Sequence, residues 1–373
     1  MQHNGPSPAV RRLLDSFSPR LAVEEARTPP ALWYIDPEFF AWECYRLLCT
    51  WQPAARLSCL EKPGAYVAGR WLNLPYVVVR DEKGTLRALA NVCRHHAAEV
   101  AVGTGCAAEL VCPYHGWSYH LHGGLKRAPG LGRATGFRVE EHALPPLHVE
   151  CWGPWAWIHG GTPERSLREA LQPLYRRLAG MEFESLTHVA RREYELACNW
   201  KVFVDNYLDG GYHVASVHAG LAGGLDLSQY RSEIHERFSI QSCPAAAEHT
   251  PSGVEFAERL EGTACYAWIY PTFMINRYGP VMDTNWVVPL PVNRTRVVFD
   301  YFFAASHAAD AAFVERSLAA SHVVQVEDTA VCESVQRGLA SGCYQQGPYA
   351  AAEAPMFAFH RLLWAELRGQ SGA

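Results

Sequence analysis

The sequence predicts an α+β protein with two domains, a β-rich domain followed by a larger domain in which helices cover an antiparallel sheet. The chain has 373 residues and 49% of them are hydrophobic, which is enough for two packed cores. Alternating apolar runs and turn residues fill much of its first half, whereas the second half combines helical patterns with a strand-rich tract at about 264–304. We expect an N-terminal segment over residues 1–40, a β-rich domain over 41–165 and a larger domain over 166–373.

Composition and charge exclude some functions. The formal net charge is -5 and the basic residues are scattered, so we expect no nucleic-acid partner and no polybasic membrane anchor. The first twenty residues lack the apolar core of a signal peptide, and no run of about 18 apolar residues could span a bilayer. These observations predict a cytoplasmic protein that does not bind a membrane.

Two short loops carry a metal-binding pattern. Cys93 and His95 form a CxH pair, sixteen residues follow, and Cys112 and His115 form a CxxH pair. Zinc fingers usually place Cys with Cys and His with His, so a structural zinc site is the weaker interpretation. A Rieske [2Fe-2S] cluster needs one Cys and one His from each loop, because the cysteines hold one iron and the histidines hold the other. The spacing therefore predicts such a cluster.

The flanks of these loops are typical of strands. An apolar run at 76–79, a turn at 83–84 and a second apolar run lead into Cys93. After the second loop, apolar residues alternate over 117–121 up to a Gly-Gly turn. Each pair of candidate ligands is therefore expected at the tip of a hairpin.

These motifs resemble the Rieske family, and two positions favour one branch. Respiratory Rieske proteins typically carry a further cysteine and a serine where this sequence has Tyr114 and Trp117. The resemblance is to the Rieske domain of non-haem iron oxygenases and covers nearly the whole chain. It implies a Rieske iron-sulfur domain, a helix-grip catalytic domain with a mononuclear Fe(II), and electrons from NAD(P)H. We find no GxGxxG motif, so those electrons would come through a separate reductase or ferredoxin.

A mononuclear iron of this class needs two histidines and one carboxylate. In "NWKVFVDNYLDGGYHVASVHAGL", His213 and His218 are five residues apart, or about 140° around an ideal helix. Both could bind one ion only if the helix bends or ends between them, and the preceding Gly210 and Gly211 favour a loosened helix. Two such histidines alone favour structural roles, but the cluster and the family pattern NWK...NY...YH...H identify both as expected iron ligands.

The third ligand is expected from a distant helix. Asp328 lies in an apolar helical stripe, where a carboxylate is costly to bury unless it is paired or bound to a metal, and its context matches the family's carboxylate position. Glu327 and Glu333 fall off the stripe and are expected on a solvated face. The stripe consists of Val324, Val331, Val335 and Leu339.

The resemblance also implies a homotrimer, in which the cluster of one subunit serves the iron of the next through an acidic residue. Asp209 resembles that acid, since a carboxylate between two imidazoles fixes their orientation. Many relatives place the acid three residues before the first histidine, however, and here Gly210 stands there. Asp205 therefore remains a competitor for the role.

The catalytic half resembles plant-type choline monooxygenase and bacterial relatives that act on quaternary amines. The resemblance implies hydroxylation or demethylation of a small amine such as choline or a betaine with O2. Aromatic faces bind such a cation well, although aromatic residues along strands are more often core. Alternatives are an oxygenase that hydroxylates or O-demethylates aromatic rings, a Rieske electron carrier and a zinc-stabilised binding module. The candidate substrate-binding residues are Tyr266, Trp268, Tyr270, Phe273, Tyr278 and Trp286.

Overall fold

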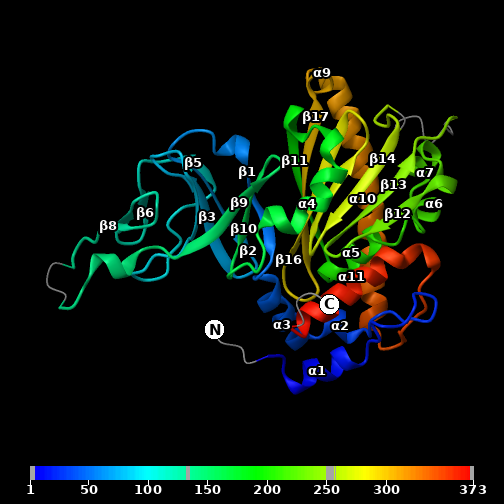
Figure 1. The fold of residues 1–373 in the computed structure, drawn as a ribbon, viewed down its shortest axis with the longest axis horizontal. Helices are drawn as coiled ribbons and strands as arrows, with labels where there is room; N and C mark the ends of the chain where they lie inside the picture. Colours follow the sequence, from blue (N-terminus) through cyan, green and yellow to red (C-terminus); the bar gives the residue numbers. More distant parts are fainter. Residues whose placement is uncertain (1–4, 132–134, 249–255, 257, 370–373) are drawn as a thin grey trace. The chain divides into compact units, whose positions relative to one another are not determined.

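The computed structural model describes residues 5–131, 135–248, 256 and 258–369 and divides the chain into two compact units (Figure 1). The inserted unit is continuous and covers residues 47–177, whereas the main unit combines residues 1–46 with 178–373. The units divide after residues 46 and 177, whereas the expected boundaries were residues 40 and 165, and the placement of two helices accounts for the shift. Helix α3 (Pro37–Leu47) lies almost entirely in the main unit, and α4 (Leu167–Arg177) packs on a strand of the inserted unit.

The inserted unit is β-rich, as predicted. One antiparallel sheet has the order β1-β10-β9-β4-β3-β2-β5, and a smaller sheet has the order β6-β7-β8. A core that includes Val77, Leu89 and Trp117 lies beneath the two candidate cluster loops. The strands are β1 (Trp51–Arg56), β2 (Ala65–Trp71), β3 (Leu74–Arg80), β4 (Leu86–Ala90), β5 (Thr104–Cys106), β6 (Leu110–Val111), β7 (Ser118–Tyr119), β8 (Leu125–Arg127), β9 (Pro146–Trp152) and β10 (Trp155–His159).

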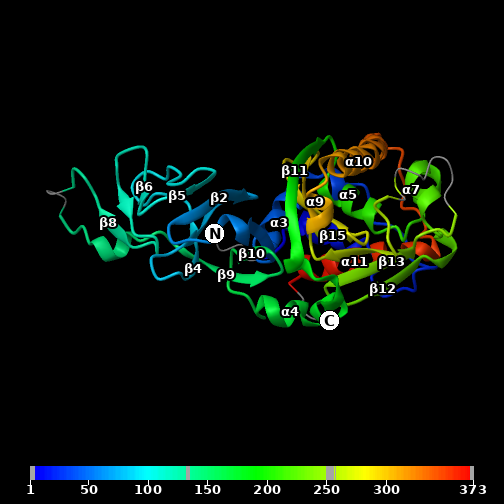
Figure 2. The same ribbon diagram turned by 90° about the horizontal axis from the view of Figure 1, so that it is seen from above.

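The main unit is built on one antiparallel sheet of order β11-β17-β16-β15-β14-β13-β12. Helices α5 and α10 contact each other (Figure 2). Helix α5 also contacts β16. The strands are β11 (Leu186–Leu196), β12 (Arg231–Ile234), β13 (Phe238–Pro244), β14 (Thr263–Ile269), β15 (Phe273–Arg277), β16 (Val281–Pro289) and β17 (Thr295–Ala304). Besides α3, the helices that the structure describes in this unit are α1 (Pro8–Asp15), α2 (Leu32–Ile35), α5 (Trp200–Tyr207), α6 (Val214–Val217), α7 (Ala219–Gly224), α9 (Ala305–Ala308), α10 (Ala311–Ala340) and α11 (Ala354–Leu367).

Helix α10 is the longest helix in the described chain. The Asp310 side chain accepts a hydrogen bond from Phe313 N and caps its first turn, and many of its residues are good helix formers. The apolar stripe read from the sequence is rotated from the buried face, since Val335 is 45% exposed while Cys332 and Gln336 are buried. The buried face carries small and polar side chains, which let the helix approach the sheet closely and leave room for a cavity.

A buried ion pair joins the N-terminal residues to the rest of the main unit. Lys201 Nζ on α5 lies 2.7 Å from Glu43 Oε2 on α3, and both side chains are fully buried. The rings of Trp200, Tyr34 and Phe39 surround the ammonium at 5.2 to 5.8 Å. Burial raises the pKa of Glu43 to about 6, and burial lowers the pKa of Lys201. The pair explains why residues 1–46 belong with the C-terminal half.

Within the part of the chain that the structure describes, none of the helices has the length and apolar character that crossing a membrane requires.

Candidate metal centres and cavity

Each cluster loop is closed by its own backbone around a buried cysteine. Cys93 N donates to Ala98 O at 2.8 Å, and Cys112 N donates to Trp117 O at 2.8 Å. Asn91 holds the first loop, because its side chain accepts from two backbone N–H groups and donates to a carbonyl. The loops therefore keep their shape through contacts close in sequence.

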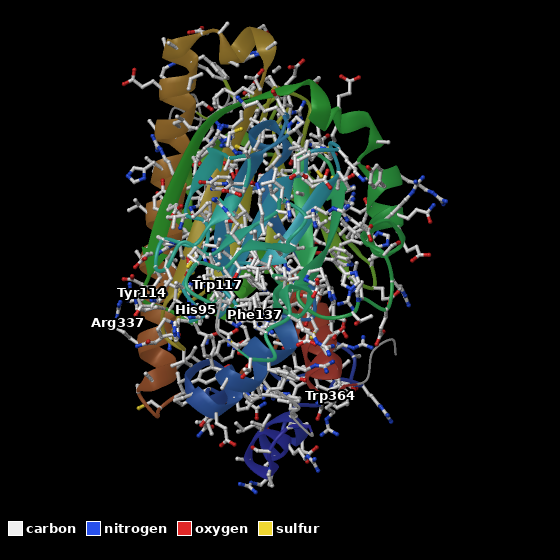
Figure 3. All side chains as sticks on the ribbon, turned by 90° about the vertical axis from the view of Figure 1, so that its left-hand side faces the viewer. His95, Tyr114, Trp117, Phe137, Arg337 and Trp364 are labelled. Atoms are coloured by element: carbon white, nitrogen blue, oxygen red, sulfur yellow. The ribbon has the colours of Figure 1, made fainter. Side chains whose placement is uncertain are left out.

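The four predicted cluster ligands meet at one end of the inserted unit. The ring centroids of His95 and His115 are 4.7 Å apart. The His95 ring stacks on Trp117 with centroids 4.6 Å apart, and Figure 3 labels these two residues near each other. His95 Nδ1 is buried without a hydrogen-bond partner among the described residues. Burial raises the pKa of the Cys112 thiol, and the Cys93 thiol interacts with it. Two neighbouring thiols and two neighbouring imidazoles, one with an unpartnered nitrogen, fit a Rieske cluster.

The second centre begins where α5 ends. Gly210 and Gly211 adopt φ of +72° and +76°, and a Cβ on Gly210 would lie 2.0 Å from Ala352 O. His213 follows these glycines, and His218 lies at the junction of α6 and α7 with φ -114°. Helix α6 fills the four residues between the two histidines, and the chain leaves helical geometry before His213 and again at His218.

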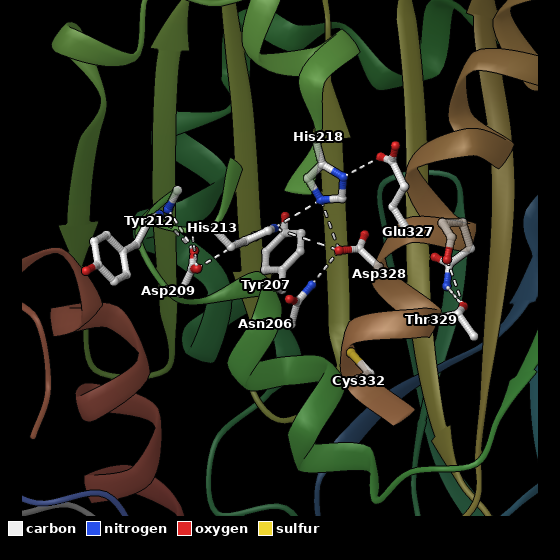
Figure 4. A network of polar contacts seen from close by, with 12 residues as sticks. Asn206, Tyr207, Asp209, Tyr212, His213, His218, Glu327, Asp328, Thr329 and Cys332 are labelled. Carbon is white, nitrogen blue, oxygen red and sulfur yellow. Dashed lines mark hydrogen bonds and ion pairs between the residues drawn. The ribbon is translucent and has the colours of Figure 1, made fainter. Parts of the chain in front are cut away.

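His213, His218 and Asp328 converge on one point (Figure 4). The two Nε2 atoms are 3.1 Å apart, and Asp328 Oδ1 lies 3.1 Å from His218 Nε2 and 3.8 Å from His213 Nε2. Asn206 Nδ2 donates to the same Oδ1 at 2.7 Å and orients the carboxylate. Within the described residues, this is the one group of three or more His, Cys, Asp or Glu side chains with such mutual geometry.

Carboxylates behind the histidines orient both rings. His213 Nδ1 lies 2.6 Å from Asp209 Oδ2, and His218 Nδ1 lies 2.7 Å from Glu327 Oε2. If each Nδ1 carries the proton that these carboxylates accept, both Nε2 lone pairs face Asp328, and three electron-pair donors share one point. A divalent iron would satisfy such a set. Burial lowers the pKa of His218, but Asp328 and Glu327 raise it further, so the balance is upward.

The position of Glu327 differs from the sequence-based expectation. Its carboxylate contacts His218 instead of lying on a solvated face, and its side chain is 34% exposed. Glu333 is also half-buried and accepts a hydrogen bond from Ala197 N at 2.9 Å. The position of the apolar stripe could not predict either contact, because the partner of each glutamate is more than 100 residues away in sequence.

The two candidate acids have different surroundings. Asp209 contacts the His213 ring and accepts from the backbone N–H groups of residues 211–213. Asp205 lies one turn earlier on α5, accepts from Tyr34 Oη at 2.7 Å and lies 2.9 Å from His360 Nε2. The structure therefore brings Asp209, and not Asp205, to the histidine pair.

The three convergent side chains open on a cavity of about 820 Å³, including the space at its mouth. Two of the six aromatic residues proposed for substrate binding, Tyr266 and Tyr278, line it. Residues outside the six candidates complete the wall. They include Phe203, Tyr207, Tyr230, Phe256, Arg259 and Phe299.

The other four aromatic candidates do not line this cavity. Phe273 and Trp286 form a cross-strand pair, and each is an odd number of residues from the cavity-lining pair Asn276 and Asp283, so they lie on the opposite face of the sheet. Trp268 shares the face of Tyr266 but packs against Phe359 of α11. The guanidinium of Arg237 covers the ring of Tyr270. Strand parity was readable from the sequence, but the strand registers were not.

Comparisons with known proteins agree with both centres. A family described as the Rieske [2Fe-2S] domain matches residues 50–145, and one described as the ring hydroxylating alpha subunit (catalytic domain) matches residues 183–368. Chloroplastic choline monooxygenase of Arabidopsis thaliana is 43% identical, over 96% of this chain and 87% of that protein. The carnitine monooxygenase oxygenase subunit of Escherichia coli strain K12 is 28% identical, over 86% of this chain and 87% of that protein.

A solved structure adds the fold. The quaternary ammonium Rieske monooxygenase CntA, in complex with L-carnitine, superposes with a TM-score of 0.80 at 26% identity. The match covers 92% of this chain and 96% of that chain. Fold, donor sets and relatives agree, and the chain belongs to the Rieske non-haem iron oxygenases, as an alpha subunit with a [2Fe-2S] domain and a mononuclear-iron catalytic domain.

Proposed function

We propose that this chain oxidises a small quaternary or methylated amine, such as choline or a betaine, by hydroxylation or demethylation with O2. Electrons would come from NAD(P)H through a separate reductase or ferredoxin. The observation that carries the proposal is the convergence of His213, His218 and Asp328 at a cavity with tyrosine walls. The names of the relatives, which specify choline and carnitine, support the same class of substrate.

When bound, the cluster stores electrons singly and the iron activates O2, while the protein supplies position, proton control and a water-poor cavity. Asp209 and Glu327 hold the Nδ1 sides of the two histidines, and Asn206 orients Asp328. These contacts fix the three donor atoms before substrate enters, so little reorganisation is needed during turnover.

The cavity wall offers ring faces to a cation. Tyr266 stacks on Tyr230 with centroids 6.5 Å apart, and Tyr278 meets Tyr266 edge-on at 5.6 Å. Burial raises the pKa of Tyr230, Tyr266 and Tyr278, so all three phenols stay neutral. A permanent cation cannot shed its charge in such a site, and each ring face compensates by roughly 0.5 to 2 kcal/mol.

A panel of substrates tests the proposal. Chemically reduced holoenzyme should oxidise its cluster faster when O2 and a quaternary amine are both present, and should release an oxidised product. A neutral isostere with carbon in place of nitrogen should stimulate the reaction far less. Tyr266→Leu should weaken the binding of the cationic substrate. Tyr266→Phe retains the aromatic ring face and serves as the control. Preferential oxidation of a neutral arene would favour ring hydroxylation or O-demethylation instead.

The same proposal covers assembly. We expect a homotrimer in the cytoplasm, with Asp209 linking His213 to the cluster of a neighbouring subunit. Its contact with the His213 ring supports this role, since Asp205 is bound to Tyr34 and His360. Asp209→Asn should keep both metals but slow cluster oxidation in single turnover, because an amide cannot accept from two imidazoles as a carboxylate does. A slow Asp205→Asn beside a fast Asp209→Asn would transfer the role to Asp205.

A further inference from the structure

Arg259 places a guanidinium with unused hydrogen-bond donors in the wall of the cavity, beside the Asp283 carboxylate. The side chain is 4% exposed and lines the cavity together with Asp283 and Tyr278. Its Nη2 lies 3.4 Å from Asp283 Oδ2, and its Cζ lies 5.1 Å from the centre of the Tyr278 ring. Nε has no hydrogen-bond partner among the described residues. A guanidinium has five N–H donors, so one long ion pair leaves it underused.

Asn285 provides a second donor without an acceptor in the same wall. Asn276 Oδ1 accepts from Tyr207 Oη at 2.8 Å, which makes Asn276 Nδ2 the donor to Asp283 Oδ1 and to Asn285 Oδ1. Asn285 must therefore present its oxygen to Asn276. Its own Nδ2 is left without a partner among the described residues. Arg259 contacts Asp283 directly and Asn285 is linked to Asp283 through Asn276, and each of the two retains an unused N–H donor.

The unused N–H donors of Arg259 and Asn285 favour a ligand with several hydrogen-bond acceptors. A carboxylate has two oxygens with about four lone-pair sites and no donor, whereas the hydroxyl of an amino alcohol supplies one oxygen. Charge favours the same answer. Asp283 balances the charge of Arg259, so a zwitterionic betaine leaves the cavity without net charge from this pair and its ligand, whereas an amino alcohol with a quaternary nitrogen adds a net positive charge.

We propose that Arg259 and Asn285 bind the carboxylate of a betaine-type substrate, with its N-methyl end directed toward His213, His218 and Asp328. The proposal rests on the proposed function and narrows its substrate class. It is consistent with the contacts of Arg259, which are with Asp283 and Tyr278, while the three convergent side chains contact Asn206, Asp209 and Glu327.

The orientation determines the reaction. With an N-methyl group at the convergent side chains, one oxygen atom of O2 enters a methyl C–H bond. The other leaves as water with two protons and the two electrons from the reductase. The N-hydroxymethyl product then breaks its C–N bond, releasing formaldehyde, a proton and a tertiary amine that keeps the carboxylate. The reaction is therefore an N-demethylation.

Substitution of Arg259 in the full-length holoenzyme tests the assignment. Wild-type protein should have a KM for glycine betaine at least about tenfold below that for choline, and should release formaldehyde from glycine betaine. Arg259→Gln should raise the KM for glycine betaine about 10- to 100-fold, as expected for a lost charge-assisted hydrogen bond, and leave that for choline unchanged or lower. The kcat for glycine betaine should change by less than about threefold, since Arg259 acts on binding.

Two further variants control for folding. Arg259→Gln leaves Asp283 without its cation, so the double variant Arg259→Gln/Asp283→Asn removes both charges and retains the shape. Arg316→Gln is the matched control, because Arg316 forms an exposed ion pair with Glu258, the neighbour of Arg259 in sequence. Iron content and the EPR signal of the cluster verify each preparation.

A binding measurement separates this inference from the proposed function. Calorimetric titration measures the affinity for glycine betaine and for choline whether or not the enzyme turns over. In Arg259→Gln and in Arg259→Gln/Asp283→Asn, the affinity for glycine betaine should fall about 10- to 100-fold, and the affinity for choline should not fall. Equal losses for the two ligands, or a wild-type preference for choline, would overturn the carboxylate site. If the enzyme oxidises no quaternary amine with O2 but still binds glycine betaine through Arg259, the proposed function would be wrong and the carboxylate site would stand.

Discussion

The two candidate metal centres are assembled in opposite ways. The cluster site is local, because two loops separated by sixteen residues supply all four ligands and their own backbone closes each loop. The iron site is long-range, because His218 and Asp328 are 110 residues apart and meet only after α10 has packed on the sheet. Exposure differs as well, since His115 is exposed while His218 is 2% exposed. A centre that exchanges electrons with partners needs an accessible edge, whereas one that handles O2 needs cover.

The largest effect should follow from a change at the local site. Cys112→Ser should remove the Rieske EPR signal and visible colour of the reduced protein, because a hydroxyl does not replace the thiolate that would bind a cluster iron. Cys106→Ser is the control, since Cys106 is exposed on β5 in the same unit. A variant at Cys112 with an unchanged signal would remove that residue from the cluster site.

Loss of the distant ligand tests whether the two centres are separable. Asp328→Ala should abolish mononuclear iron and bring turnover to background, yet retain the full Rieske signal, because no cluster ligand depends on α10. His322→Ala is the matched change on the same helix, where His322 faces Tyr194. Metal analysis and EPR on one sample decide the outcome. Retained iron with full activity would exclude Asp328 as a ligand.

The buried pair beneath α5 should matter to the main unit alone. Lys201→Met leaves the fully buried Glu43 carboxylate without its cation and should lower the free energy of unfolding by about 3 to 5 kcal/mol. The second change Glu43→Leu should recover most of that loss. Denaturant unfolding followed by tryptophan fluorescence, with the cluster colour as a separate probe, measures both. A smaller effect of the single variant than of the double variant would contradict the pairing.

The carboxylate behind His218 should have an intermediate effect. Glu327→Gln keeps the shape but weakens the acceptor for His218 Nδ1, and such partners typically contribute about 10- to 100-fold in metal affinity or activity. Competition with a chelator gives the iron affinity. Glu315→Gln, an exposed position on the same helix, should leave the affinity unchanged.

The smallest effect concerns pH. The pKa of Glu43 is about 6 in the folded protein, above its ordinary value near 4.5, so the folded state binds this proton more tightly than the unfolded state. Its contribution to stability is therefore present below about pH 4.5 and is lost as the pH rises through 6. Glu43→Gln should flatten the pH dependence of the unfolding free energy in that window. An unchanged slope would show that Glu43 titrates normally.

Local chemistry was predictable from the sequence, whereas contacts between distant segments were not. Motifs and residue patterns predicted both metal centres and the α+β class, because the Cys, His and turn residues that define them lie within a few positions of one another in the sequence. The roles of Glu327 and Asn206 were not predicted, because their contacts with His218 and Asp328 form only when distant segments of the chain come together. Only two of the six aromatic candidates line the cavity, for the same reason. The composition of the segment from β14 to β16 indicates aromatic rings, but only the strand registers show which of them face the cavity.

The division of the chain also sets an order of events during synthesis. Residues 47–177 form a continuous unit that can begin to fold while it leaves the ribosome, whereas residues 1–46 belong to a unit completed only after residue 178. Glu43 and Lys201 are 158 residues apart. At translation rates of roughly 5 to 20 residues per second, Glu43 on α3 is therefore synthesised about 8 to 32 seconds before Lys201. During that interval, the aromatic residues that surround Lys201 in the finished protein lack their partner. We therefore expect chaperones to bind residues 1–46 of the nascent chain during this interval.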